Sequence, residues 1–473
     1  MKFLKLSLAA SVALGALSTA SFAQPLEEAI KGVDVSGYLR YRYTDDRRND
    51  DYGNYGKDAK HQWKAQADLK TPVMNSVAVN LGVLYDTSNN VNHGKGNDGI
   101  SGGLGAGGDE PFEVQTFYAT ITPDSTATTV MVGKQLINSP ITSAGDGDRG
   151  TGIVAMNNDI EGLTLAAAVF DSWMTDDFDA LKADKSIAKN LYALAGVYNT
   201  ETSIGNIGFQ LWGFNVTDMV DALIFTEASW KNSMFRAKVQ YSYASLDNGE
   251  DSVFASLKPG TTYASQKPKN IGNIAEDNDL FIIEGGVNFS DFNVPLDIRL
   301  GYITNFQDGT VVSLNDDSSN LSKAGKLWYQ GDHTGFSTSA PYNKTGYYES
   351  TDANVIYSAL GYKMVDDRLN LGLELAYGTV EREGKVLVDK KYKNRTVSDI
   401  TFTEIAPTIS WKHSDRLTLS AFYAYLSAEQ DVREDKLYGT NNGFIYDTAN
   451  KKANDNAKDY DRQRVRFEAK YSF

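Results

Sequence analysis

The chain has 473 residues, with 46 Lys and Arg against 61 Asp and Glu, which gives a formal net charge of −15. This acidity argues against nucleic acid as a partner, because binding to phosphates needs clustered basic side chains. The chain has no Cys, which excludes disulfide bonds, so its stability must come from hydrogen bonding and packing.

The first 23 residues are predicted to be an export signal. Lys2 and Lys5 give a basic start, residues 6–17 are mostly apolar, and residues 21–23 (Ser-Phe-Ala) match a cleavage site. The apolar run is shorter than the roughly 20 residues that a permanent membrane helix needs. We therefore expect cleavage after residue 23 and one mature domain over residues 24–473.

Alternation of apolar and polar residues recurs along the rest of the chain and predicts about eighteen β-strands. It is clearest at 369–379, where Leu recurs at every second position, and at 415–427. The predicted strands lie near 33–43, 61–70, 76–86, 113–121, 128–134, 151–158, 162–171, 189–199, 204–215, 221–230, 233–245, 279–289, 294–305, 353–363, 369–379, 401–413, 415–427 and 461–473.

The links between these strands alternate between long polar segments and tight turns. The long links are 44–60, 87–112, 135–150, 172–188, 246–278, 306–352, 380–400 and 428–460. Only 216–220 is short where a long link is expected. Such segregation is typical of a transmembrane barrel with short periplasmic turns and long outer loops, whereas a soluble sandwich has no reason for it. We predict an all-β fold, an antiparallel transmembrane β-barrel of about 18 strands.

The last predicted strand, 461–473, alternates cleanly and ends on Phe473, as outer-membrane barrels usually do. An amphipathic strand of a soluble sandwich would alternate in the same way, so the barrel assignment depends on the whole chain. Inside lipid every backbone N–H and C=O group must be paired within the protein. We therefore expect 461–473 to close the sheet against 33–43.

The polar face of the strands is expected to line the interior. The first, second and last strands are neighbours after closure, so Arg and Lys side chains should gather along one side of the pore. The alternative for each side chain is a solvated wall charge with no special role. The candidate pore-lining residues on strands are Arg40, Arg42, Lys64, Arg236, Glu284, Arg299, Glu374, Arg464 and Arg466.

The long link 135–150 is the best candidate for a loop that folds into the pore. Its glycines let backbone pack into a confined space, and Asp146 and Asp148 could face the Arg side chains across it. Opposed charges in a pore orient and sort solutes. An acidic surface turn is the alternative interpretation.

Asp146 and Asp148, together with Asp179 from the next long link, are also candidate ligands for Ca²⁺, which prefers carboxylate and carbonyl oxygens. Their spacing does not match an EF-hand loop, because Asp-Gly-Asp is not followed by a Glu at the required position. Plain solvated acids remain the alternative, and no cofactor is expected to be required.

Several function classes can be compared from the sequence. An outer-membrane enzyme needs a nucleophile with a base, but the chain has only four His and no Gly-x-Ser-x-Gly. An energised receptor needs a plug domain, and only about ten residues separate the signal from the first strand. A diffusion channel is favoured. A substrate-specific channel, or a barrel whose loops 246–278 and 306–352 bind surface ligands, remains an alternative.

Three long stretches carry a family resemblance: PLEEAIKGVDVSGYLRYRY at 25–43, GTGIVAMNNDIEGLTLAAAVFDSWM at 150–174 and RLTLSAFYAYLSAEQDV at 416–432. Over essentially its whole length the chain resembles the major outer membrane protein (MOMP) porins of Campylobacter and its relatives. The family's acidic position before the Gly-Thr-Gly stretch matches Asp146.

That resemblance implies an eighteen-stranded trimeric porin in the outer membrane of a Gram-negative bacterium. It also implies a loop folded into the lumen, cation preference and passive permeation of ions and small hydrophilic solutes. Outer-membrane lipid and lipopolysaccharide are the expected surroundings. Small outward residues, such as Ala167, Ala193 and Ala195, are candidates for the contact between protomers.

Overall fold

The computed structural model describes residues 32–50, 56–87, 112–175, 187–247, 249, 252, 275–315, 319–329, 350–388, 391–431, 446–447, 452–453 and 460–473. The predicted export signal lies outside these residues. No helix in the described part of the chain is both long and apolar enough to cross a membrane.

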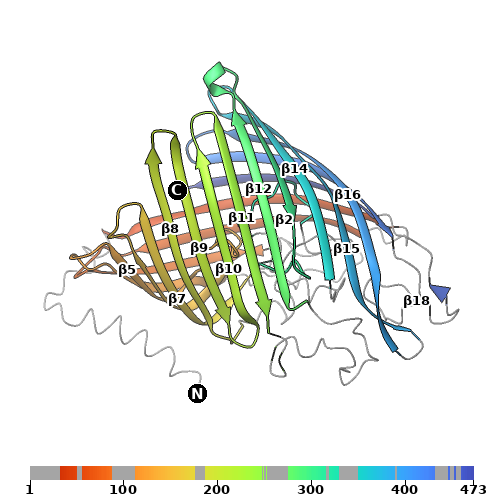
Figure 1. Cartoon of the computed structure of the whole chain (residues 1–473). Coiled ribbons are helices and arrows are strands. Elements are labelled where there is room, and N and C mark those ends of the chain that lie inside the picture. The colour runs from red at the N-terminus through yellow and green to blue at the C-terminus, as the bar shows by residue number, and fades with distance from the viewer. Residues whose placement is uncertain are drawn as a thin grey trace.

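Eighteen strands form one closed antiparallel sheet, which confirms the predicted fold class (Figure 1). They are β1 (Asp34–Asp50), β2 (Gly56–Lys70), β3 (Val77–Asp86), β4 (Phe112–Ile121), β5 (Thr128–Leu136), β6 (Arg149–Asn157), β7 (Leu163–Met174), β8 (Leu191–Thr202), β9 (Gly205–Val216), β10 (Val220–Lys231), β11 (Phe235–Leu246), β12 (Asp277–Asn288), β13 (Leu296–Thr304), β14 (Ser350–Met364), β15 (Leu369–Val388), β16 (Lys391–Lys412), β17 (Leu417–Asp431) and β20 (Tyr460–Ser472).

Three short elements lie outside that sheet in the described residues. They are the strands β18 (Tyr446–Asp447) and β19 (Lys452–Ala453), which pair with each other, and the 3₁₀ helix η4 (Ser290–Phe292) in the turn between β12 and β13.

The barrel closes where β1 pairs with β20, as expected from the first and last predicted strands. Arg42 lies opposite Glu468 in that pair. On its other edge β1 pairs with β2, where Arg40 lies opposite Lys64. Closure leaves no sheet edge with unpaired backbone groups, which is the condition for a sheet in lipid.

Side chains alternate between an apolar outer face and a more polar inner face because successive strand residues point to opposite sides of the sheet. Leu194 and Leu211 lie on the outer face and are 68% and 57% exposed. Ala167 lies opposite Leu194, so it also points outward. Ala193 and Ala195 have the other parity and point inward, so their predicted outward position was wrong.

Two long links are shorter than the sequence suggested. The predicted loop 380–400 is mostly a hairpin, because β15 and β16 continue until Val388 pairs with Lys391. The link 44–60 is likewise reduced to residues 51–55, between β1 and β2. These extensions are rich in charged residues, so they lack the regular apolar alternation that was used for the prediction.

Candidate solute pathway inside the barrel

Two loop segments lie inside the barrel. We call residues 137–148 inner loop A, and residues 309–315 with 319–329 inner loop B. Inner loop A links β5 to β6, and inner loop B follows β13. Ile141 in loop A and Trp328 in loop B are both fully buried. Residues 309–315 and 319–329, which belong to the segment 306–352 expected to be an outer loop, therefore pack within the barrel.

The two inner loops contact each other directly. The Leu314 N–H donates to the Ile141 carbonyl at 3.1 Å, and Asn320 Nδ2 donates to the Ser139 carbonyl at 2.7 Å. Strands β5 and β13 lie eight places apart in the ring of 18, almost on opposite sides. Because their loops meet, the contact must cross the interior and divide it.

Asp148 joins the two loops. It is fully buried, and its Oδ2 accepts a hydrogen bond from the Ser143 N–H at 2.7 Å. Asn315 Nδ2 from inner loop B donates to both oxygens, at 3.1 and 3.0 Å. These bonds compensate the carboxylate for its lost hydration. Asp148 therefore holds inner loop A to inner loop B.

The predicted calcium ligands are only partly described. Asp146 is half-buried, and Asp179 lies outside the described residues. Among the residues that the structure describes, no cluster of three or more His, Cys, Asp or Glu has a geometry suited to a metal ion. Calcium binding by these residues stays a prediction.

Glu404 on β16 anchors inner loop B to the barrel. Its carboxylate is fully buried. It accepts the backbone N–H groups of three successive residues, Lys326, Leu327 (3.1 Å) and Trp328 (2.9 Å). The Trp328 ring also stacks on Phe402, with centroids 5.5 Å apart and planes at 16°. Charge-assisted bonds to backbone make this carboxylate a fixed point for the loop.

Further contacts hold inner loop B deep in the barrel. Glu374 on β15 accepts hydrogen bonds from Lys326 Nζ at 2.6 Å and the Gly325 N–H at 2.7 Å. Gln240 Oε1 on β11 accepts the Ser322 N–H at 2.8 Å. Glu374 and Gln240 each lie five residues from the periplasmic end of their strands, about 17 Å along the strand.

Five arginines gather on the inner face where the barrel closes. We call this set the basic seam: Arg40, Arg42, Arg462, Arg464 and Arg466. Within the described residues, Asp46 contacts Arg462 and Arg464, and Glu468 contacts Arg40 and Arg42. The Arg462–Asp46 pair is 2.8 Å apart, as is the Arg42–Glu468 pair.

The predicted pore-lining residues therefore fall into two groups. Arg40, Arg42, Arg464 and Arg466 lie together in the basic seam, and Lys64 lies beside them on β2, paired with Asp86 at 3.2 Å. The others lie away from the seam on β11–β15. There Arg236 contacts Asp297 through two bonds, Arg299 contacts Glu284 at 3.2 Å, and Glu374 holds inner loop B.

Sequence reasoning missed the anchoring role of Glu404, although its parity on the strand indicated an inward side chain. The sequence signal was a lone carboxylate between Phe402 and Ala406, at a position where the neighbouring inward residues are apolar. It also missed Asp46, because residue 46 was assigned to a loop. The longer β1 brings Asp46 opposite Arg464.

The sequence profile of the Campylobacter major outer membrane protein family matches residues 1–471. No curated protein matches the chain at a significant level.

Solved structures of Pseudomonas aeruginosa channels have a similar fold. OccK9 (OpdG) superposes with a TM-score of 0.57 at 11% identity, covering 94% of this chain and 100% of that one. OccK3 (OpdO) gives 0.56 at 12% identity, covering 95% and 99%. OpdK, solved with vanillate, gives 0.52 at 11% identity, covering 93% and 99%.

Proposed function

The chain belongs to the Campylobacter major outer membrane protein family and is an outer-membrane β-barrel channel, and from this premise we propose that it is a water-filled, cation-preferring porin. Ions and small hydrophilic solutes would diffuse through it passively. The observation that carries the proposal is the charged inner face, which holds the basic seam as well as the Arg236–Asp297 and Arg299–Glu284 pairs. Charged walls of this kind suit a hydrated pathway.

We propose that the two inner loops set the width of the pathway. Support comes from their hydrogen bonds to each other and from the depth at which Glu374 and Gln240 hold inner loop B. The space left between inner loop B and the basic seam would then be the narrowest part. Charged side chains border it on both sides, so it would act on the charge of a solute as well as on its size.

Cation preference is supported by the overall charge of −15. A negative surface potential concentrates cations near the channel mouths and repels anions. The basic seam opposes this effect locally, so the preference would be moderate rather than absolute.

The proposed channel needs no catalysis and no cofactor. His61 on β2 lies on the outer face, where its Nδ1 shares a hydrogen bond of 2.7 Å with Tyr41 Oη. His413 lies in a periplasmic turn. The other two His residues, at 93 and 333, lie outside the described residues. Neither described His lies on the inner face, where a reacting solute would pass.

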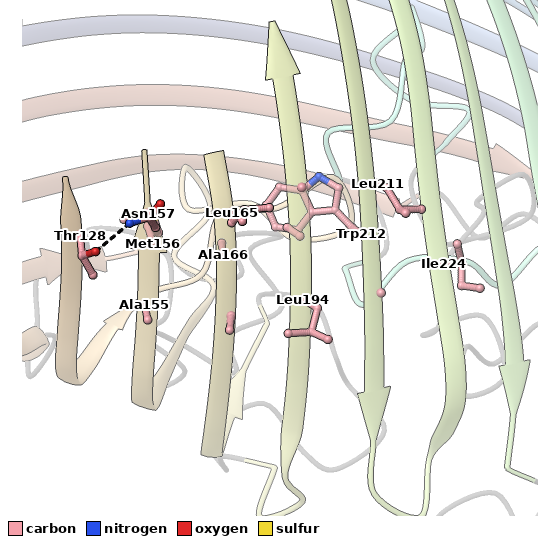
Figure 2. A pocket seen from close by; sticks show the side chains of 14 residues that line it. Thr128, Ala155, Met156, Asn157, Leu165, Ala166, Leu194, Leu211, Trp212 and Ile224 are labelled. Atoms are coloured by element: carbon pink, nitrogen blue, oxygen red, sulfur yellow. Dashed lines mark hydrogen bonds between the residues drawn. The ribbon is translucent and has the colours of Figure 1, made fainter. Parts of the chain in front are cut away.

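We propose a homotrimer whose contact includes an apolar groove on β6–β10. One row of outward residues runs Ala155, Ala167, Leu194, Gly213 and Ile224 across the five strands. This groove has a volume of about 690 Å³ (Figure 2). Small residues beside protruding Leu and Ile allow close packing of a second barrel. Lipid and lipopolysaccharide would cover the remaining outer surface.

A substrate-specific channel is the second candidate, and the basic seam favours it. Five arginines on one inner surface would select acidic solutes more strongly than a general porin requires. A substrate-specific channel should bind one class of solute saturably, whereas a diffusion porin should not.

Single-channel recording of the purified protein in a planar bilayer, under a salt gradient, tests the leading proposal. Ohmic steps in groups of three, with a reversal potential on the cation side, are expected. A β-rich, folded protein that gives no conductance would contradict a diffusion channel and favour a role for the outer loops in binding surface ligands.

A further inference from the structure

Three buried polar atoms in the basic seam region have no hydrogen-bond partner among the described residues. They are Nε of Arg40, Oγ1 of Thr44 and Nε of Arg466. All three belong to the adjacent strands β1 and β20, and Thr44 lies directly opposite Arg466. Both Nε atoms can only donate, and the hydroxyl can donate as well. A group that satisfies all three must therefore be an acceptor.

The charges in the seam are also unbalanced. Arg462 and Arg464 both contact Asp46, and Arg40 and Arg42 both contact Glu468, so each of these carboxylates faces two guanidinium groups. Arg40 reaches Glu468 only at 3.9 Å. Arg466 has no carboxylate within 4.0 Å in the described part of the chain. Like charges this close repel one another in a partly desolvated site, and an anion would relieve that repulsion.

The unpaired donors lie beside the pathway. The guanidinium carbon of Arg466 is 5.3 Å from the centre of the Phe422 ring on β17. Lys326 Nζ, at the deep end of inner loop B, is 6.0 Å from the centre of the same ring. The basic seam and inner loop B therefore approach each other at Phe422. A solute that passes between them meets two cations and one aromatic ring.

We propose that Arg466, Arg40 and Thr44 form a binding site for an oxyanion group, a carboxylate or a phosphate carried by a passing solute. This proposal rests on the channel function proposed above and names a solute class for it. Guanidinium groups bind carboxylate and phosphate oxygens through charge-assisted hydrogen bonds. Binding that is weak and reversible lets such a solute enter and leave.

Two small probes test the site in planar bilayers. Benzoate and inorganic phosphate are titrated separately into wild-type channels at constant ionic strength, while single-channel conductance and current noise are recorded. We expect a saturable fall in conductance. Stronger block by benzoate would indicate carboxylates with an apolar body, which fit Phe422, and stronger block by phosphate would indicate phosphorylated solutes.

Two variants distinguish a specific binding site from non-specific attraction of anions by the positive charge of the seam. Arg466→Gln removes the charge and should raise the half-blocking concentration about tenfold, as expected for the loss of a hydrogen bond to a charged group. Thr44→Val removes only the hydroxyl, so it should weaken block while the reversal potential stays unchanged. Arg416→Gln removes an equal charge in a periplasmic turn and should leave block unchanged.

The outcomes distinguish the site from the channel function. Normal conductance with no effect of either probe, or block that persists unchanged in Arg466→Gln, would overturn the oxyanion site and leave the channel intact. Absence of conductance would contradict the channel. Saturation-transfer NMR of benzoate with the detergent-solubilised barrel would then decide the site, since loss of the signal in Arg466→Gln supports it and no wild-type signal refutes it.

Discussion

The segments that anchor inner loop B and the basic seam use the same residue types for different purposes. On β11–β16 the charged side chains shown above are paired or hold a loop, as Arg236 with Asp297 and Glu404 with three backbone N–H groups. At the seam, Asp46 and Glu468 each face two arginines, and the Nε of Arg466 has no hydrogen-bond partner among the described residues. Paired charges fix structure, whereas charges in excess are available to a solute.

The largest expected effect comes from removing the anchor of inner loop B. Glu404→Ala leaves three buried N–H donors without an acceptor, each at a cost of about 1–3 kcal/mol. Inner loop B should detach, single-channel conductance should rise, and trypsin should gain access to Lys326. Glu201→Ala, at an exposed position of β8, is the control. Wild-type conductance and protease resistance in Glu404→Ala would show that other contacts hold the loop.

Neutralising the seam tests the opposite side of the comparison. Replacing Arg40, Arg42, Arg464 and Arg466 by Gln removes four positive charges from the pathway, so cation preference should increase. Asp46→Asn should shift the reversal potential the other way, because it removes a negative charge that contacts Arg462 and Arg464. Unchanged reversal potentials in both variants would remove the seam from the ion pathway.

A smaller effect is expected from the contact between the two inner loops. Asn315→Ala removes the side-chain amide that donates hydrogen bonds from inner loop B to Asp148. A hydrogen bond to a charged group contributes about 1.5–3 kcal/mol to stability. Both loops keep their other contacts, so mean conductance should change little while open-channel noise increases. Noise at the wild-type level in a normally folded variant would contradict the proposed role of this contact.

The smallest effect concerns a periplasmic turn far from both regions. Hydrogen bonds from Asn157, the Ala127 N–H and Thr126 lower the pKa of Asp159 below its usual value. A carboxyl with a lowered folded-state pKa stabilises the protein above its unfolded pKa of about 4, and that stability is lost as the pH falls through the folded-state value. Asp159→Asn should therefore reduce the difference between thermal midpoints at pH 7 and pH 3. An unchanged difference would mean that other groups control acid stability.

The strands were predictable because alternate burial leaves a period-two pattern wherever one face meets lipid. Residues 369–379 and 461–473 carry that pattern clearly, and both are strands in the structure. Ala193 was placed on the wrong face because its neighbours Tyr192 and Leu194 are also apolar, so hydropathy alone does not set the parity there. The face of Ala193 is instead set by the strand register, which places it opposite the inward residue Phe214.

The interior was less predictable than the barrel. The sequence of inner loop B resembles that of a polar outer link. Its position inside the barrel depends on hydrogen bonds from its backbone to Glu404, which lies in a strand 76–78 residues later. Such long-range pairing leaves no local pattern. The basic seam was predictable in outline from parity and closure, but the pairing of its arginines with Asp46 depends on the register that brings Asp46 opposite Arg464.

The most direct test of the account asks whether the inner face beside the seam meets water. The chain has no Cys, so single cysteines can be placed without a background reaction. Ser420 lies opposite Glu468 on the inner face of β17, and Ala421 is its outward neighbour. A charged, membrane-impermeant methanethiosulfonate reagent should reduce the current of Ser420→Cys channels and leave Ala421→Cys channels unchanged. Reaction at Ala421→Cys alone would contradict the assignment of the two faces, and with it a pathway lined by the basic seam.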